Sequence, residues 1–424
     1  MSNITRHTIK ICIVLMLVTL NAKAQNWPQW RGPNGNGIAE KGNYPVSFSA
    51  TEGILWKAEL PGKGGSTPIV WNDRIILTSA IGEGPEAEDG VLCYDWTGKL
   101  LWQVKLGRQT PGRHARGSGS NPSAVTDGER IFVFFKSSTA AALDFNGKVL
   151  WKTNLRETYG EISYFWDLGS SPVLVNKNVV FTVMHEGSSY LLALDRATGK
   201  VAWKADRNYP GGRESPQSYT TPLVIKEGNQ TSLVVWGADH LTGHDAATGK
   251  LIWSYGGFNP EKRAAWRTIA SPAHYQGIIV VPYGRGRFTA AMKTGGGGNK
   301  TEKDFLWQKT DIGADVATPL ASNGRVYLLS FNGILNCLDV ATGEELWQTK
   351  LPDSKGVFYS SPTLAGDKLY ICSDEGSFYV CEVSPAGIRI LNQTRFEDNF
   401  VATPVLLRDR LLLRGTKNLY SIGR

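Results

Sequence analysis

The sequence contains little cysteine and few long apolar runs. Its 424 residues include five cysteines, none adjacent to another and none in a Cys-x-x-Cys pair. This spacing excludes a zinc ribbon, a thioredoxin-type redox site and a disulfide-rich scaffold. Beyond the first 24 residues, no apolar stretch approaches the roughly 20 residues that cross a bilayer. We therefore expect a folded protein without a membrane-spanning segment.

The first 24 residues have the pattern of a signal peptide. Arg6 and Lys10 precede an apolar run from Ile11 to Leu20, and Ala22-Lys23-Ala24 is a small-x-small cleavage site. We expect cleavage near Ala24 and a periplasmic or secreted mature protein. The net charge of +8 includes three basic leader residues and no leader acid, so the mature chain carries +5. This small excess does not favour nucleic-acid binding, and we expect a monomer.

A hydroxyl or small residue followed by proline and an apolar run recurs eight times. The intervals between successive prolines range from 54 residues at the first to 42 residues at the last. Repeats of this length, rich in turn residues and short apolar runs, are typical of propeller blades rather than of helical solenoids. The eight prolines are Pro68, Pro122, Pro172, Pro222, Pro272, Pro319, Pro362 and Pro404.

A second motif lies between these prolines and joins a tight turn to a tryptophan. Its form is Asp-x-x-Thr-Gly-Lys-x-x-Trp, as in Asp195 to Trp203. We expect the Asp to accept hydrogen bonds from the turn amides and the Gly to adopt a positive φ. The Trp should lie on the outermost strand and pack flat between blades. In the fifth unit a glycine run, Gly295 to Gly298, replaces the Asp turn, and we expect a widened turn there.

Each unit contains four short antiparallel strands, which predicts an all-β, eight-bladed propeller. The eighth unit ends at Arg424 after three strands, whereas Ile54 to Leu60 resembles the outer strands of the other units. We expect this N-terminal strand to complete the last blade, so that no edge stays unpaired. The predicted organisation is a signal peptide (1–24), an N-terminal extension (25–52) and one propeller (53–424).

The turn-and-tryptophan units resemble the tryptophan-docking repeat of pyrroloquinoline-quinone (PQQ) type propellers. That family includes quinoprotein dehydrogenases, the BamB-type propeller of outer-membrane barrel assembly, and exported PQQ-like repeat proteins with no assigned activity. The opening Trp27-Pro28-Gln29-Trp30-Arg31-Gly32-Pro33 looks most like the last group. For this chain the resemblance implies an exported scaffold that binds partners through its loops.

The resemblance also allows a test for quinone chemistry. Quinoprotein dehydrogenases hold PQQ between a Trp and a disulfide of adjacent cysteines, beside a calcium bound by Glu, Asn and Asp. Here Cys93, Cys337, Cys372 and Cys381 are never adjacent, and we can place no calcium-binding carboxylate set. We therefore expect buried free thiols, no PQQ and no metal.

Candidate ligand-binding residues lie on loops that should open on one face. The connections between blades and the loops between second and third strands share that face, and the connections are long only between Trp102 and Pro272. Arg beside Trp or Tyr suits carboxylate, sulfate or sugar ligands through bidentate hydrogen bonds and ring stacking. The candidates are Arg113, His114, Arg116, Tyr164, Trp166, His185, Arg213, Trp266, Arg267, Tyr283, Arg285 and Arg287.

Three functions remain open from the sequence. The favoured one is a noncatalytic binding or assembly scaffold of the cell envelope, whose partner is an envelope protein or an anionic glycan. A protein acting on anionic polysaccharide, with a lyase-like set of His114, Tyr164 and Arg267, is the first alternative. A PQQ-dependent oxidoreductase is the second. No motif assigns a catalytic residue.

Overall fold

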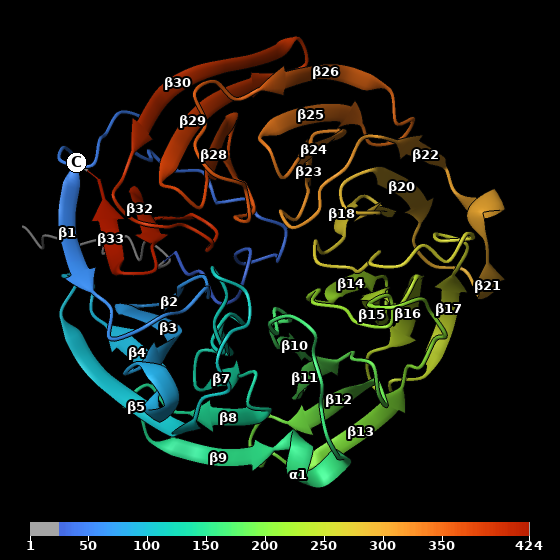
Figure 1. Cartoon of the computed structure of the whole chain (residues 1–424), viewed down its shortest axis with the longest axis horizontal. Coiled ribbons are helices and arrows are strands. Elements are labelled where there is room, and N and C mark those ends of the chain that lie inside the picture. The colour runs from blue at the N-terminus through green and yellow to red at the C-terminus, as the bar shows by residue number, and fades with distance from the viewer. Residues whose placement is uncertain (1–24, 424) are drawn as a thin grey trace, which may run out of the picture.

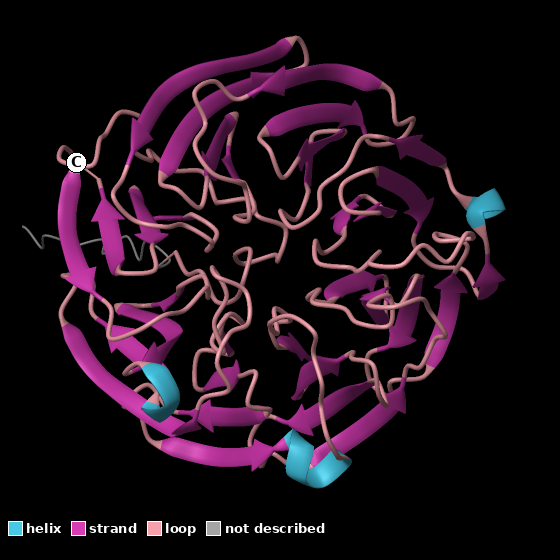
Figure 2. Ribbon diagram, viewed as in Figure 1, coloured by secondary structure: helices cyan, strands magenta, loops and turns pink. Residues whose placement is uncertain are grey.

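The protein is a closed ring of eight antiparallel sheets around a central channel (Figures 1 and 2). The computed structural model describes residues 25–423. Each sheet is one blade, with its first strand nearest the channel and its last at the circumference. The expected all-β, eight-bladed propeller is confirmed.

Seven blades have four strands, and blade 4 has five. Blade 1 contains β2 (Ile69–Trp71), β3 (Arg74–Ile81), β4 (Glu88–Tyr94) and β5 (Leu100–Arg108), and blade 2 contains β6 (Val125–Thr126), β7 (Ile131–Phe134), β8 (Thr139–Leu143) and β9 (Val149–Asn154). Blade 3 contains β10 (Val173–Val175), β11 (Asn178–Val183), β12 (Tyr190–Asp195) and β13 (Val201–Asp206). Blade 4 contains β14 (Leu223–Glu227), β15 (Gln230–Gly237), β16 (His240–Asp245), β17 (Leu251–Tyr255) and β21 (Gly298–Lys300).

Blades 5 to 8 continue around the ring. Blade 5 contains β18 (Ala273–Tyr275), β19 (Ile278–Tyr283), β20 (Phe288–Lys293) and β22 (Trp307–Thr310), and blade 6 contains β23 (Leu320–Ser322), β24 (Arg325–Leu329), β25 (Ile334–Asp339) and β26 (Glu345–Lys350). Blade 7 contains β27 (Thr363–Ala365), β28 (Lys368–Cys372), β29 (Ser377–Ser384) and β30 (Gly387–Arg395). Blade 8 contains β31 (Val405–Leu407), β32 (Arg410–Arg414), β33 (Asn418–Ile422) and β1 (Ile54–Glu59). The short helices are η1 (Gly84–Glu86), α1 (Leu155–Tyr159) and η2 (Glu302–Asp304).

The ring closes by pairing the two ends of the chain. Strand β1 pairs antiparallel with β33, and Lys57 lies opposite Tyr420 in the register. Figure 1 shows the blue β1 beside the red β33. The prediction that the N-terminal strand completes the eighth blade is confirmed.

The docked tryptophans explain why the turn carries glycine. The indole of Trp307 lies over Gly343 of the next blade, where an added Cβ would come within 2.5 Å of a ring carbon. Its Nε1 donates to the carbonyl of Val340 at 3.0 Å. Gly343 has φ +73°, so the position favours glycine on backbone grounds as well. The same stacking recurs for Trp56 over Gly98, Trp102 over Gly147, Trp151 over Gly199 and Trp203 over Gly249.

The aspartates of these turns act as expected. Oδ1 of Asp195 accepts hydrogen bonds from the amides of Ala197 and Thr198 and from the hydroxyl of Thr198. These bonds stabilise the charged carboxylate and lower the pKa of Asp195. Asp95, Asp144, Asp245 and Asp339 cap their turns in the same way.

The turn of the fifth unit is wide, as expected, since residues 294–306 separate β20 from β22. It also contains a strand that the sequence did not predict. The last glycine of the run begins β21 (Gly298–Lys300), which pairs in parallel with β17 of blade 4. Without the Asp turn in blade 5, Trp253 lies over Gly243 of its own sheet, and no described glycine of blade 5 lies beneath its ring. The additional strand covers the outer edge of blade 4 beside that tryptophan.

A belt of hydroxyl side chains joins the innermost strands around the channel. Seven of the eight hydroxyls accept a hydrogen bond from the backbone amide of the matching residue one blade earlier, at 2.8–3.1 Å. This geometry explains the repeated Ser/Thr-Pro pair, because all members except Ser123 directly precede a proline. The hydroxyl belt consists of Thr67, Ser123, Ser171, Thr221, Ser271, Thr318, Ser361 and Thr403.

The N-terminal extension crosses the face opposite the long loops. Trp27 bridges to Val70 of blade 1, and Ile38 bridges to Leu364 of blade 7. Between them, the guanidinium of Arg31 is fully buried and donates to the carbonyl of Pro319 at 2.9 Å. Burial lowers the pKa of Arg31 to about 9. The extension therefore spans the lower end of the channel, where the dark blue chain reaches the centre of Figure 1.

Candidate functional site

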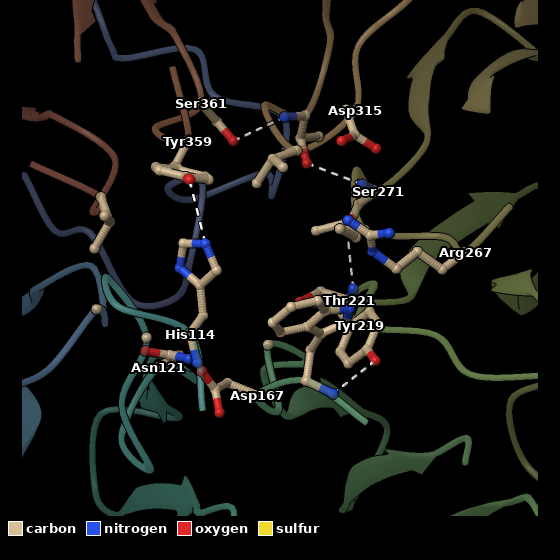
Figure 3. Close-up of a pocket in the computed structure, with 18 of the residues that line it drawn as sticks. His114, Asn121, Asp167, Tyr219, Thr221, Arg267, Ser271, Asp315, Tyr359 and Ser361 are labelled. Carbon is tan, nitrogen blue, oxygen red and sulfur yellow. Dashed lines mark hydrogen bonds between the residues drawn. The ribbon is translucent and has the colours of Figure 1, made fainter. Parts of the chain in front are cut away.

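The channel opens into a cavity of about 840 Å³ on the face that carries the long loops (Figure 3). All eight members of the hydroxyl belt line its floor, and Trp30 of the extension also contacts it. Connections between blades and the loop between β19 and β20 form its wall, as the blade topology predicts. A volume of this size suits a small-molecule ligand.

Three arginines and one carboxylate form the charged side of this cavity. Arg285 and Arg287 belong to a Gly-Arg-Gly-Arg turn between β19 and β20, while Arg267 precedes β18. Gly286 has φ +78°, and its missing Cβ would lie 3.3 Å from the amide nitrogen of Asp315. The turn therefore packs closely on the loop that carries Asp315 and holds opposite charges along one wall.

Aromatic rings form the neighbouring wall. Trp166, Trp266, Tyr219 and Tyr359 all line the cavity. The guanidinium of Arg267 lies 5.7 Å from the centre of the Trp166 ring. The same guanidinium forms an ion pair with Glu214 at 3.5 Å, with both side chains about 10% exposed. Burial of this pair fixes Arg267 against the indole.

The connection between blades 1 and 2 crosses toward the far side of the cavity mouth. Nε of Arg116 is 2.8 Å from Asp374 of blade 7. His114 Nε2 and the hydroxyl of Tyr359 lie 3.4 Å apart, as the dashed line in Figure 3 shows. These contacts join residues more than 240 positions apart in the chain.

Asp167 anchors the base of that connection. Its carboxylate accepts hydrogen bonds from the backbone amides of Arg113 at 2.6 Å and His114 at 3.0 Å. It also forms an ion pair with Lys136 at 2.7 Å, with side chains 11% and 5% exposed. Asp167 therefore holds the segment that presents His114 and Arg116 to the cavity.

Three polar atoms of the cavity wall are covered by protein yet lack a hydrogen-bond partner among residues 25–423. They are Nε of Arg267, Nε1 of Trp166 and Oδ1 of Asp315. Burial raises the pKa of Asp315, and the nearby charges of Arg267 and Arg285 oppose that shift. An unpaired buried polar atom costs about 1–3 kcal/mol, so a partner for these atoms would stabilise this wall.

Seven of the twelve residues predicted from the sequence line this cavity. They are His114, Arg116, Trp166, Trp266, Arg267, Arg285 and Arg287. The connections and the second-to-third-strand loops do share one face, which is why residues from separate blades meet here.

Arg113 and Arg213 are absent from the cavity lining, and both lie against Phe165. Both are exposed, and their guanidinium carbons lie 3.9 and 5.9 Å from the centre of the Phe165 ring. We call Arg113, Phe165 and Arg213 the crest.

Three further candidates face the interior of the fold instead of the cavity. His185 is 4% exposed, and its Nδ1 accepts a hydrogen bond from the Gly187 amide. Tyr283 is 2% exposed and donates to the carbonyl of Trp266. The hydroxyl of Tyr164 is buried without a partner among residues 25–423. These side chains stabilise loops, and Tyr164 does not join His114 and Arg267 in the cavity.

Sequence reasoning missed the carboxylates of this face. Asp167, Glu214 and Asp315 pair with or face the basic residues, so the positive charge of this face is partly neutralised. No local pattern distinguishes these acids from solvated ones. The hydroxyl belt was present in the sequence as the repeated Ser/Thr-Pro pair, but its role in lining the cavity follows only from the ring.

The residues present do not fit a PQQ-calcium centre. Cys93, Cys337, Cys372 and Cys381 are free, buried and distributed over the strands of three blades. Burial raises the pKa of each thiol to about 12. Residues 25–423 contain no cluster of three or more His, Cys, Asp or Glu side chains able to hold a metal ion.

In the same range no helix is long and apolar enough to cross a membrane. The predicted signal peptide lies outside the described residues.

Comparison with known proteins identifies a family. The family model described as outer membrane protein assembly factor BamB matches residues 40–217 and 183–385. The BamB proteins of Yersinia pestis and Salmonella typhimurium are 23% and 25% identical to this chain over 319 and 306 residues. These alignments cover 75% and 69% of this chain, and 64% and 71% of the relatives, so the chain spans less than two thirds of the Yersinia protein.

Solved structures share the fold at low sequence identity. BamB from Moraxella catarrhalis aligns with a TM-score of 0.60 at 13% identity, covering 87% of this chain and 99% of that one. A europium-containing methanol dehydrogenase aligns with a TM-score of 0.68, also at 13% identity, covering 93% and 90%. At this identity the matches establish the propeller architecture alone.

Proposed function

Because this chain belongs to the BamB family, we propose that it is a noncatalytic scaffold of the cell envelope that binds a protein partner through its long-loop face. The family match over residues 40–385 carries this proposal. The relatives are named outer membrane protein assembly factors. With the signal peptide cleaved near Ala24, the chain would act in the periplasm.

The crest is the proposed contact surface. Arg and aromatic side chains are enriched at protein interfaces and supply a large share of their binding energy. Arg113 and Arg213 are exposed and flank the ring of Phe165. The backbone amide of Arg113 is held by Asp167, so this part of the crest is anchored before a partner arrives.

The polar groups around the cavity support binding rather than chemistry. The side chains of Arg116, Lys136 and Arg267 are each engaged in an ion pair with a carboxylate. Such paired charges hold loops in place and leave no side chain assigned to a reacting atom.

The test is genetic complementation in the native host. Deleting the gene should lower the amount of folded β-barrel protein in the outer membrane, measured by heat-modifiable mobility, and wild type should restore it. The Arg113→Ala/Arg213→Ala variant should restore less at equal protein level. Arg389→Ala, on the outer strand of blade 7 with its side chain 70% exposed, is the matched control and should restore fully. Unchanged β-barrel protein levels in the deletion strain would overturn the proposal.

A further inference from the structure

The cavity wall combines hydrogen-bond donors that need an acceptor with an acceptor that needs a donor. Nε of Arg267 and Nε1 of Trp166 are the donors, and Oδ1 of Asp315 is the acceptor. Figure 3 shows Arg267 and Asp315 on the same side of the cavity. All three residues line the cavity. The ligand that removes all three penalties must carry both an acceptor and a donor.

The floor of the cavity adds further donors. Seven hydroxyls of the belt accept an inter-blade amide hydrogen bond, and within residues 25–423 none of these seven donates to a protein acceptor. Their protons are therefore available to a ligand in the channel. A floor of O–H donors beneath three arginines favours a ligand with a negative group.

The aromatic wall specifies the shape of the ligand body. Trp166 and Trp266 lie beside the arginines, and Tyr359 lies across the cavity. Flat rings of this kind pack against the C–H faces of a cyclic ligand, while the polar atoms between them bind its substituents. The volume of about 840 Å³ accommodates a small ligand with more than one ring.

We propose that this cavity binds a sugar acid, either a hexuronate or a short uronate oligosaccharide. The carboxylate pairs with Arg267 and with the belt hydroxyls, and a ring hydroxyl donates to Asp315. The sugar face packs on Trp166. A neutral sugar brings no negative charge to the arginines of this wall, whereas a plain dicarboxylate has no donor for Asp315 and places a second negative charge beside it.

This inference is independent of the proposed scaffold function, because the crest lies outside the cavity. Loss of sugar-acid binding would leave the complementation result unchanged, and a failed complementation would leave sugar-acid binding unchanged. The two proposals can therefore fail separately.

Isothermal titration of the mature protein with digalacturonate tests the proposal. Its methyl ester, which keeps the hydroxyls and loses the charge, and succinate, which keeps two carboxylates and loses the ring, are the matched ligands. Digalacturonate should bind about tenfold more tightly than either, since a hydrogen bond to a charged group contributes about 1.5–3 kcal/mol.

Variants then locate the site. Arg267→Lys keeps the charge but loses the forked geometry, and Asp315→Asn keeps the shape but loses the strong acceptor. Each should weaken digalacturonate binding by about tenfold. Trp166→Phe should weaken it by a smaller factor, because an aromatic surface remains. Arg389→Ala, which removes an arginine 70% exposed on the outer strand of blade 7, should leave the affinity unchanged.

Four results would overturn the proposal. They are no heat of binding in correctly folded wild type, equal affinity for the ester or succinate, equal loss in Arg389→Ala and Arg267→Lys, and tighter binding of peptides with free C-termini than of digalacturonate. Unchanged melting temperatures identify correctly folded variants, and the conservative Asp315→Asn keeps the test valid if Arg267→Lys fails to fold.

Discussion

The two faces of the propeller are built from different kinds of sequence. On the face of the Asp-Thr-Gly turns, one motif recurs and each docked Trp meets a glycine of the next blade, as Trp151 meets Gly199. On the long-loop face, no two connections are alike, and the contacts join distant parts of the chain, as Arg116 joins Asp374. The repeated face specifies the ring, and the irregular face carries the groups available for binding. Variants on the two faces should therefore separate stability from binding.

The largest effect is expected where a docked tryptophan is removed. Trp307→Ala empties the slot over Gly343 and should lower the free energy of unfolding by about 3–5 kcal/mol. Leu306→Ala is the adjacent control, since that side chain is 39% exposed and should cost far less. Chemical denaturation of both variants measures the difference, and equal losses would contradict the docking role.

The next effect depends on pH and comes from a carboxylate near the long-loop face. Asp89 of β4 is fully buried and accepts a hydrogen bond from Ser137 of blade 2. Burial raises its pKa from 3.8 to about 7. Between these values the folded protein keeps a proton that the unfolded chain has lost, so Asp89 contributes less stability as pH rises.

Asp89→Asn removes this titration. Relative to wild type it should gain stability from pH 4 to pH 7 and then level off, reaching on the order of 4 kcal/mol at pH 8. Denaturation at several pH values measures this difference. A difference that is constant with pH would show that Asp89 keeps an ordinary pKa.

A smaller effect is expected for the glycine beneath a tryptophan. Gly343→Ala places a Cβ within 2.5 Å of the Trp307 ring, whereas Gly324→Ala, at a similar φ of +74°, meets nothing within 4 Å. The first should be less stable than the second by about 1–3 kcal/mol. Because both variants place alanine at nearly the same positive φ, their backbone strain is the same. Equal melting temperatures would therefore show that contact with the Trp307 ring does not destabilise Gly343→Ala.

The smallest effect on stability is expected at the crest. Arg113→Ala/Arg213→Ala should change the free energy of unfolding by only about 0.5 kcal/mol, since both residues are exposed. The same variant should lose partner binding. A large loss of stability would show that these arginines stabilise the fold. The variant could then not be used to test partner binding.

The repeated face was predictable because its contacts are local and periodic. The Asp-Thr-Gly turn, the positive φ of its glycine and the closing strand Ile54–Glu59 all follow from motifs that occur several times in the sequence. The fifth unit was not predictable in the same way. There a glycine run stands in place of the Asp turn, and β21 pairs with β17 of blade 4.

The cavity was predictable in position but not in charge. The loop topology placed Arg267 and Arg285 on one face, yet the pairing of Arg267 with Glu214 depends on two connections meeting in space. His185 and Tyr283 show the opposite error, since polar side chains on loops were counted as exposed and lie buried in hydrogen bonds. Burial on long loops depends on packing that no short motif records.

Photo-crosslinking in living cells tests most directly whether the long-loop face binds the partner. A photoreactive phenylalanine replaces Phe165 at the crest or, as the control, Leu346 on the outer strand β26, which is 37% exposed. The account predicts a crosslink from position 165 to a protein of outer-membrane assembly, lost in the Arg113→Ala/Arg213→Ala background, and none from position 346. A crosslink to that machinery from position 346 and none from position 165 would contradict it.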